Sequence, residues 1–142
     1  MVHSALGQTI DLYHQALSEL IRGNSGPQKA RFSHLDDACL ANPFGPPVTG
    51  WEHVETMLDR VAALYIDAGP KQFERVATYV TTDLACIVEI ERAWVSIRGH
   101  GQPDEVALRV TTVFRLEAGG WKVVHRHADS ITAPRPPETV LQ

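Results

Sequence analysis

The order of elements along the chain predicts an α+β fold. In the first half, apolar residues recur every three or four positions, which is typical of helices packed on a core. After Gly69-Pro70 the spacing changes to two, which is typical of strands. Because long strands joined by short connections form an antiparallel meander, we expect helices on one face of a single curved sheet.

Two amphipathic helices are predicted in the first half of the chain. The first covers residues 8–21, and its apolar face comprises Leu6, Ile10, Tyr13, Leu17 and Leu20. The second covers residues 51–65 and ends before Gly69-Pro70. Thr49 and Glu52 have the spacing of a capping box, which would start this second helix.

Strands are expected in one short and four long segments. A brief strand at 38–41 ends at the loop 42–47, where two consecutive prolines remove backbone donors. The long strands are predicted at 73–82, 84–95, 106–117 and 121–131. Residues 1–131 are therefore predicted to form one domain, followed by an extended, proline-rich tail at 132–142.

The composition argues against several kinds of partner. The net charge of -4 comes from 17 acidic and 13 basic residues that are interspersed, so no basic stripe for nucleic acid is expected. No apolar run is long enough to span a bilayer and no secretory signal is visible, so we expect a cytoplasmic protein without a membrane partner. Cys39 and Cys86 are expected to be free thiols. The glycines form no phosphate-binding motif, so no cofactor is expected.

The last predicted strand carries ionisable groups on both faces. Alternation places Trp121, Val123, His125, His127 and Asp129 on one face, and Lys122, Val124, Arg126, Ala128 and Ser130 on the other. His125 and His127 could coordinate one metal ion, but Asp129 would lie roughly 13 Å from His125, too far to be a third ligand. We therefore expect no metal site, and we expect the histidines to pack with Trp121 on the outer face of the sheet, with an acid/base role as the alternative.

Three segments carry a resemblance to a known family. They are Leu35-Asp36-Asp37-Ala38 leading to Asn42-Pro43-Phe44-Gly45, the helix start Gly50-Trp51-Glu52, and the closing Trp121-x-x-Val124-His125-x-His127. Together they resemble the SnoaL-like, ketosteroid isomerase-like branch of the nuclear transport factor 2 superfamily, over about residues 8–130. The resemblance implies a cone-shaped, curved antiparallel sheet that wraps the N-terminal helices around a central apolar pocket.

The resemblance also implies candidate site residues. Tyr13 matches the tyrosine that donates to a ligand oxygen in ketosteroid isomerase, whereas the base position holds Asn42 and the acid position holds Thr112. Asn42 cannot accept a proton, so isomerisation through that constellation is not expected. The family register instead points Glu91 and Arg126 inward, and with Tyr13 they are the predicted catalytic residues. The predicted substrate-binding residues are Asn42, Phe44, Trp51, Tyr65, Glu89, Thr112 and Phe114.

A second reading of the same strand remains open. The more apolar alternating set is Cys86, Val88, Ile90, Arg92 and Trp94, which would put Glu91 on the convex face. Glu91 and Arg126 would then form a structural or interface ion pair.

Two functions follow from these residues. The first is a small-molecule enzyme that uses cofactor-independent acid/base chemistry on a lipophilic or carbonyl-bearing metabolite, as an isomerase, cyclase, dehydratase or hydrolase. The alternative is a non-catalytic ligand-binding or oligomerisation module of the same fold. Both faces of the long strands are apolar, so a homodimer through the convex face is expected, with Trp121, Val123 and His125 near the contact.

Overall fold

The computed structural model describes residues 4–142, so the first three residues of the predicted domain lie outside the described part. The helices are α1 (Ala5–Ile21), α2 (Gly26–Arg31), α3 (Trp51–Leu64) and a short 3-10 helix, η1 (Pro137–Val140). The strands are β1 (Cys39–Ala41), β2 (Val48–Thr49), β3 (Tyr65–Ile66), β4 (Gln72–Val80), β5 (Leu84–Ile97), β6 (Asp104–Glu117) and β7 (Gly120–Asp129).

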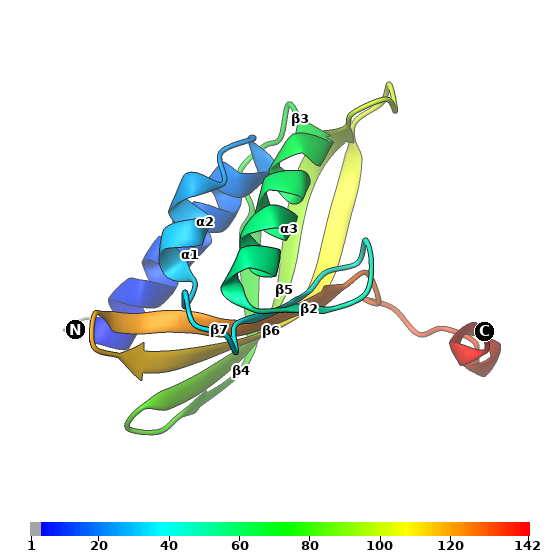
Figure 1. Cartoon of the computed structure of the whole chain (residues 1–142). Coiled ribbons are helices and arrows are strands. Elements are labelled where there is room, and N and C mark those ends of the chain that lie inside the picture. The colour runs from blue at the N-terminus through cyan, green and yellow to red at the C-terminus, as the bar shows by residue number, and fades with distance from the viewer. Residues whose placement is uncertain (1–3) are drawn as a thin grey trace.

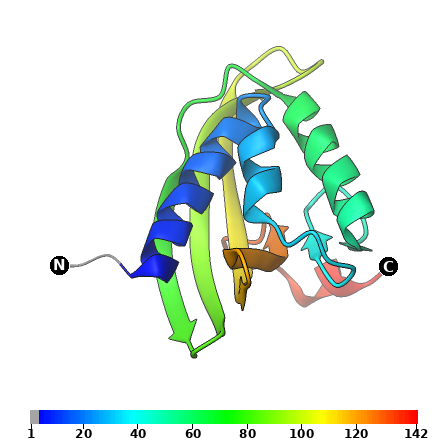
Figure 2. The same cartoon turned by 60° about the vertical axis from the view of Figure 1, so that its left-hand side comes forward.

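The strands form one curled sheet whose inner face holds the helices (Figure 1). Their order is β2-β1-β7-β6-β5-β3, with β4 also paired to β5. All pairs are antiparallel except β1 with β7. Figure 2 shows α1, α2 and α3 on the same side of the sheet. The predicted α+β cone, with helices wrapped by a curved sheet, is confirmed.

The two long helices begin in different ways. Ser4 precedes α1, and its side-chain oxygen accepts a hydrogen bond from the Gly7 N–H at 2.9 Å, so the helix begins before residue 8. The predicted capping box of α3 is wrong. Thr49 lies in β2, paired with Cys39, and the cap position is held by Gly50, which has no side chain to accept a bond. Gly50 has a φ of 96°, a conformation that glycine adopts without steric cost.

The register of β5 decides the position of Glu91. Its side chain points inward, together with Ile87, Glu89 and Ala93, and only 1 % of Glu91 is exposed. The alternative placement on the convex face is therefore wrong. The helices cover the inward-facing row of β5, so its residues are buried even though the outward-facing row is more apolar.

A β-bulge in β7 changes which residues share a face. Phe114 pairs with Val123 while the preceding residue, Val113, pairs with His125, so Val124 is an extra residue in the strand. Val123 consequently points inward and is fully buried in the core. The prediction that Val123 shares the convex face with His125 is wrong, because the strict alternation that it assumed is interrupted here. Trp121 lies on the same side as Val123 and also packs against the core, so its predicted place on the outer face beside the histidines is wrong as well.

The core lies between the helices and the inner face of the sheet. It is built from the apolar stripes of α1 and α3 and from inward strand residues, including Leu17, Leu58, Ile87, Phe114 and Val123. The tail after β7 extends away from this core, and its 3-10 helix η1 is fully exposed (Figure 1). Among residues 4–142, no helix is long and apolar enough to cross a bilayer.

Candidate functional site

A buried ion pair joins two strands beneath the helices. The Arg126 guanidinium on β7 donates to both carboxylate oxygens of Glu91 on β5, through Nη1 and Nη2, each at 2.8 Å. This bidentate geometry is the strongest form of a carboxylate–arginine interaction. Only 6 % of Arg126 is exposed, so water screens the pair very little.

A second cation reaches the same carboxylate. The Nζ atom of Lys71, which directly precedes β4, donates to Oε1 of Glu91, and the Lys71 side chain is itself buried. Sequence reasoning missed Lys71, because it lies in a turn outside the predicted strand 73–82 and no spacing links it to Glu91. The cluster thus contains two positive charges and one negative charge.

The two cations determine the protonation of the site. Burial alone would raise the pKa of Glu91, but the charges of Arg126 and Lys71 outweigh burial and hold the pKa far below its usual range. Burial lowers the pKa of Lys71, and Glu91 opposes this effect. Glu91 is therefore a permanent carboxylate near neutral pH, which makes it a poor proton acceptor.

Tyr13 completes the cluster from α1. Its hydroxyl accepts a hydrogen bond from Nη1 of Arg126 at 2.7 Å and lies 2.7 Å from Oγ1 of Thr112 on β6. Burial raises the pKa of Tyr13 to about 12. Phe114 packs edge-to-face on the Tyr13 ring, with 5.4 Å between the ring centroids. The hydroxyl is therefore engaged within the protein and supports the orientation of Arg126.

We expect Tyr13→Phe to lower the free energy of unfolding by about 1–3 kcal/mol, because it leaves a buried Arg126 N–H and the Thr112 hydroxyl without their partner. Ligand affinity should stay within about twofold, since a hydrogen bond to the ligand would be worth roughly 1 kcal/mol or more. Urea unfolding measures the first quantity and calorimetry the second. A variant that keeps its stability but loses ligand binding would instead place the hydroxyl on the ligand.

An apolar pocket opens beside the charge cluster. It lies between α1, α3, the loop after β1 and the inner face of the sheet, and its empty space is about 480 Å³ when the open solvent at its mouth is included. Its apolar lining comprises Leu17, Leu20, Ile21, Leu40, Pro43, Phe44, Leu58, Val61, Tyr65, Leu108 and Ala128. Its other lining residues are Gln28, Asn42, Lys71 and Arg126, so the cations border an otherwise largely apolar space.

Two amides in the pocket wall have no partner for their side-chain nitrogen. Gln28 on α2 is fully buried, and neither its Oε1 nor its Nε2 is hydrogen bonded within residues 4–142. Asn42 uses its Oδ1 to accept the Phe44 N–H at 3.0 Å, while its Nδ2 is buried without a partner there. Buried polar groups are normally paired, so such groups need an explanation. Sequence reasoning missed Gln28, since a lone glutamine in a short helix carries no signal.

The predicted catalytic and substrate-binding residues fall into three groups according to whether they line the pocket, an adjoining hollow or neither. Asn42, Phe44, Tyr65 and Arg126 line the pocket. Glu91 lines a smaller adjoining hollow, which shares Lys71 and Tyr65 with the pocket. Tyr13, Trp51, Glu89, Thr112 and Phe114 are absent from the pocket wall as far as the described residues define it. The prediction that these five residues contact a ligand is therefore not supported for this pocket, because their packing places them elsewhere.

Each of these residues is used elsewhere in the fold. Trp51, at the start of α3, stacks on His34, with 3.8 Å between ring centroids. Thr112 and Phe114 contact Tyr13 on the far side of the charge cluster. Sequence alternation predicts which face such residues share, but neighbouring helices decide which part of that face remains open.

Glu89 lies in a separate buried cluster. Its Oε1 is 2.8 Å from Nε2 of His14 on α1, and its Oε2 accepts a hydrogen bond from Nε of Arg75 at 3.1 Å. The His14 ring stacks on Phe73, with 3.7 Å between centroids. These contacts join α1 to the β4–β5 hairpin, so Glu89 serves this corner of the fold. Among residues 4–142, no group of three or more His, Cys, Asp or Glu side chains is placed to hold a metal ion.

Comparison with known families and structures agrees with this architecture. The chain matches the SnoaL-like domain family over residues 8–134, and it belongs to that family. The predicted membership in the SnoaL-like, ketosteroid isomerase-like branch of the nuclear transport factor 2 superfamily is confirmed. None of the curated proteins compared with the chain matches it significantly.

Solved structures share the fold at low identity. A candidate dehydratase of the NTF2-like family from Streptomyces avermitilis is 22% identical over 90% of this chain and 94% of its own, with a TM-score of 0.70. A ketosteroid isomerase-like protein from Erwinia carotovora atroseptica is 16% identical over 92% of this chain and 97% of its own, with a TM-score of 0.76. An NTF2-like superfamily protein from Salmonella enterica is 16% identical over 94% of this chain and 93% of its own, with a TM-score of 0.74. At these identities the likeness shows the fold alone.

Proposed function

We propose that the chain binds a small, largely apolar molecule in the pocket, with an oxygen atom of that molecule facing Lys71 and Arg126. The observation that carries this proposal is the apolar hollow bordered by two buried cations that share a single carboxylate. Apolar pockets with a few convergent polar groups are the usual form of small-molecule sites.

The same arrangement supports a particular kind of catalysis. We propose a cofactor-independent enzyme of the isomerase, cyclase, dehydratase or hydrolase type, in which Lys71 and Arg126 stabilise negative charge that develops on a carbonyl oxygen of a lipophilic metabolite. Glu91 would hold the two cations in place and stay ionised throughout. The candidate dehydratase and the ketosteroid isomerase-like protein are consistent with this class of chemistry.

The second candidate function is a non-catalytic ligand-binding module. It is favoured by Asn42, which occupies the position of the general base and has its oxygen engaged by the Phe44 N–H. An amide does not take up a proton near neutral pH. In this case the pocket would bind and release its ligand unchanged.

Native mass spectrometry of the purified chain tests the pocket directly. We expect an adduct that disappears in a Phe44→Ala variant, because Phe44 lines the pocket at its rim and is 50% exposed. Leu35→Ala, at a comparably exposed leucine outside the pocket, is the control and should keep the adduct. The adduct-free chain is then incubated with the identified molecule. An enzyme would change the mass or the isomeric form of that molecule, whereas a binding module would leave the molecule unchanged. An adduct unaffected by Phe44→Ala would argue against this pocket.

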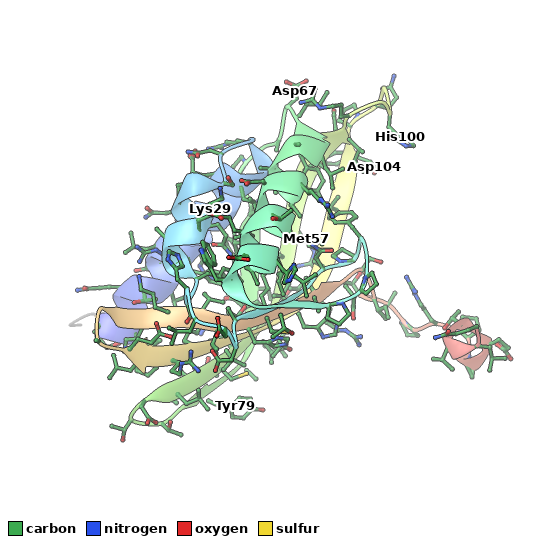
Figure 3. The ribbon with its side chains drawn as sticks, in the orientation of Figure 1. Lys29, Met57, Asp67, Tyr79, His100 and Asp104 are labelled. Carbon is green, nitrogen blue, oxygen red and sulfur yellow. The ribbon has the colours of Figure 1, made fainter. Side chains whose placement is uncertain are left out.

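We further propose a homodimer through the convex face of the sheet. The pairing register places Ala77, Tyr79, Cys86, Val88, Ile90 and Val113 in neighbouring rows on that face. Tyr79 is 64% exposed and lies on the side of the sheet away from the helices (Figure 3). An apolar centre of this kind is typical of an interface between subunits. Val123 is excluded from this contact by its burial in the core, whereas His125 stays on the convex face.

The dimer is expected to weaken in acid. Burial, together with the neighbouring His127, lowers the pKa of His125, so its neutral form is favoured in the folded chain. Protonation at lower pH would place positive charge in the contact, so dimer affinity should be complete at about pH 8 and should fall towards pH 5. Sedimentation velocity at both values measures this.

Two arginine substitutions check that the interface is the convex face. Val88→Arg on that face should give a monomer, while Leu35→Arg at an exposed site of the loop before β1 should leave the dimer intact. A Val88→Arg variant that still dimerises, or a dimer that is unchanged from about pH 8 to 5, would place the contact elsewhere.

A further inference from the structure

We propose that the ligand of this pocket is a small monocarboxylate, whose anionic group lies against Lys71 and Arg126 while its apolar body fills the hollow. This inference rests on the proposed function and names the ligand class for the same pocket. It follows from three properties of the pocket wall, which are its charge, its hydrogen-bond donors and its size.

The charge of the wall is unbalanced. Lys71 and Arg126 line the pocket, and within residues 4–142 its lining contains no aspartate or glutamate. The one carboxylate in contact with both cations is Glu91, which leaves a surplus of one positive charge. Glu89 does not compensate for this, since it is paired with Arg75 and His14. A buried charge without a partner is costly, and a ligand with one negative charge would remove that cost.

The hydrogen-bonding groups of the wall are mainly donors. Lys71 carries three N–H groups, and one donates to Glu91. Arg126 carries five N–H groups and makes three side-chain bonds, to Tyr13 and Glu91. The buried nitrogens of Asn42 and Gln28 add donors without partners among residues 4–142, while Oε1 of Gln28 adds one acceptor without a partner there. A carboxylate suits such a wall because it accepts several hydrogen bonds and donates none.

The size and polarity of the hollow narrow the class further. The empty space of about 480 Å³ includes open solvent at the mouth, so the enclosed part is smaller and admits only a small ligand, and most of its lining is apolar. A phosphate ester carries up to two charges and a large hydration shell, which exceed the surplus of one charge and the apolar surroundings. A cationic ligand would be repelled. A single carboxylate on an aromatic or aliphatic body matches both the charged part and the apolar part of the wall.

Binding calorimetry with three matched probes tests this inference on the full chain. Phenylacetate, phenylacetamide and 2-phenylethanol share a ring and differ in charge and in acceptor groups. We expect phenylacetate to bind at least about tenfold more tightly than either neutral probe, which corresponds to about 1.4 kcal/mol. Lys71→Met removes the surplus charge and keeps the Glu91–Arg126 pair, so this variant should stay folded and lose most of the preference.

Lys29→Met is the matched control. Lys29 lies on α2 and pairs with Asp59 at the surface, at 2.7 Å (Figure 3). The substitution removes the same charge and side-chain type outside the pocket, so the preference for phenylacetate should be unchanged. Circular dichroism and thermal unfolding of both variants check that any loss of binding is not a loss of fold.

The pH dependence provides a readout that a purely structural role of Lys71 would not give. The ionisable groups around Lys71 are Glu91, Arg126 and Tyr65. Glu91 remains ionised, the pKa of Arg126 is raised, and burial raises that of Tyr65, so these groups keep their charge state into alkaline solution. Burial lowers the pKa of Lys71, so phenylacetate affinity should fall in alkaline solution, at a lower pH than for an exposed lysine, as Lys71 loses its proton. In Lys71→Met this alkaline loss should be absent.

The outcomes separate the inference from the proposed function. If the neutral probes bind as tightly as phenylacetate, the pocket binds small molecules but the carboxylate class is wrong. If none of the three probes binds, both the pocket function and the ligand class are contradicted. If Lys71→Met keeps the full preference for phenylacetate, the surplus charge is not its cause and the inference is overturned.

Discussion

Replacing Glu91 with glutamine is expected to lower the free energy of unfolding by about 3–5 kcal/mol. The substitution preserves the shape of the side chain but leaves Arg126 and Lys71 buried and charged beside a neutral amide. An amide can accept a hydrogen bond, but it cannot compensate two cations whose side chains are each only 7% exposed. Equilibrium unfolding in urea, followed by circular dichroism, measures the loss.

Glu74→Gln is the matched control for this experiment. Glu74 on β4 makes a single exposed contact with Arg92 at 3.0 Å, and an exposed pair contributes at most about 1 kcal/mol. The same chemical change should therefore have a small effect at Glu74 and a large one at Glu91. Equal stability of the two variants would show that the Glu91 cluster is not a buried, charged pair.

Acid unfolding gives a second readout of the same substitution. The pKa of Glu91 is depressed in the folded chain, so its stabilising contribution is present above the unfolded-state pKa of about 4.3 and is lost as pH falls below that value. The wild-type chain should lose stability in acid more steeply than Glu91→Gln, which has no proton to take up at this position. Parallel acid profiles would contradict the assigned shift.

Phe114→Ala is expected to cost about 3–5 kcal/mol of stability, as for other large-to-small changes at buried aromatic residues. Phe114 is fully buried and packs edge-to-face on Tyr13, whose hydroxyl contacts Arg126. The change would leave a cavity behind the charge cluster rather than in the ligand pocket. Urea unfolding should show the full loss, while phenylacetate affinity of the folded fraction should remain within about threefold.

Phe44→Ala should have the opposite effect, with little loss of stability and a clear loss of ligand affinity. Phe44 lines the pocket and is 50% exposed, so its removal leaves no buried cavity and should change stability by at most about 0.5 kcal/mol. It removes apolar area from the pocket wall, so we expect about tenfold weaker ligand binding. If Phe114→Ala abolished binding while Phe44→Ala had no effect, the ligand would lie on the Tyr13 side of the cluster.

Sequence periodicity alone was sufficient to predict the α+β architecture. The change of spacing after Gly69-Pro70 separates the helices from the long strands because each element must bury one face, and this requirement acts locally along the chain. Periodicity favoured the convex face for Glu91, whereas the family resemblance pointed Glu91 and Arg126 inward, where the structure places both. The cap and the facing of side chains were predicted less well than the elements themselves, because Gly50 holds the cap position of α3 and a bulge at Val124 interrupts the alternation of β7.

Only the tertiary structure decided how the site is built. Lys71 and Gln28 come from a turn and a short helix without a periodic pattern, and they reach the pocket because the curled sheet brings distant segments together. The bulge at Val124 reverses the face of Val123, which alternation alone could not reveal. Local patterns therefore predicted the helices and strands, whereas three-dimensional packing decided which face of a strand is buried, which residues form the charge cluster and which line the pocket.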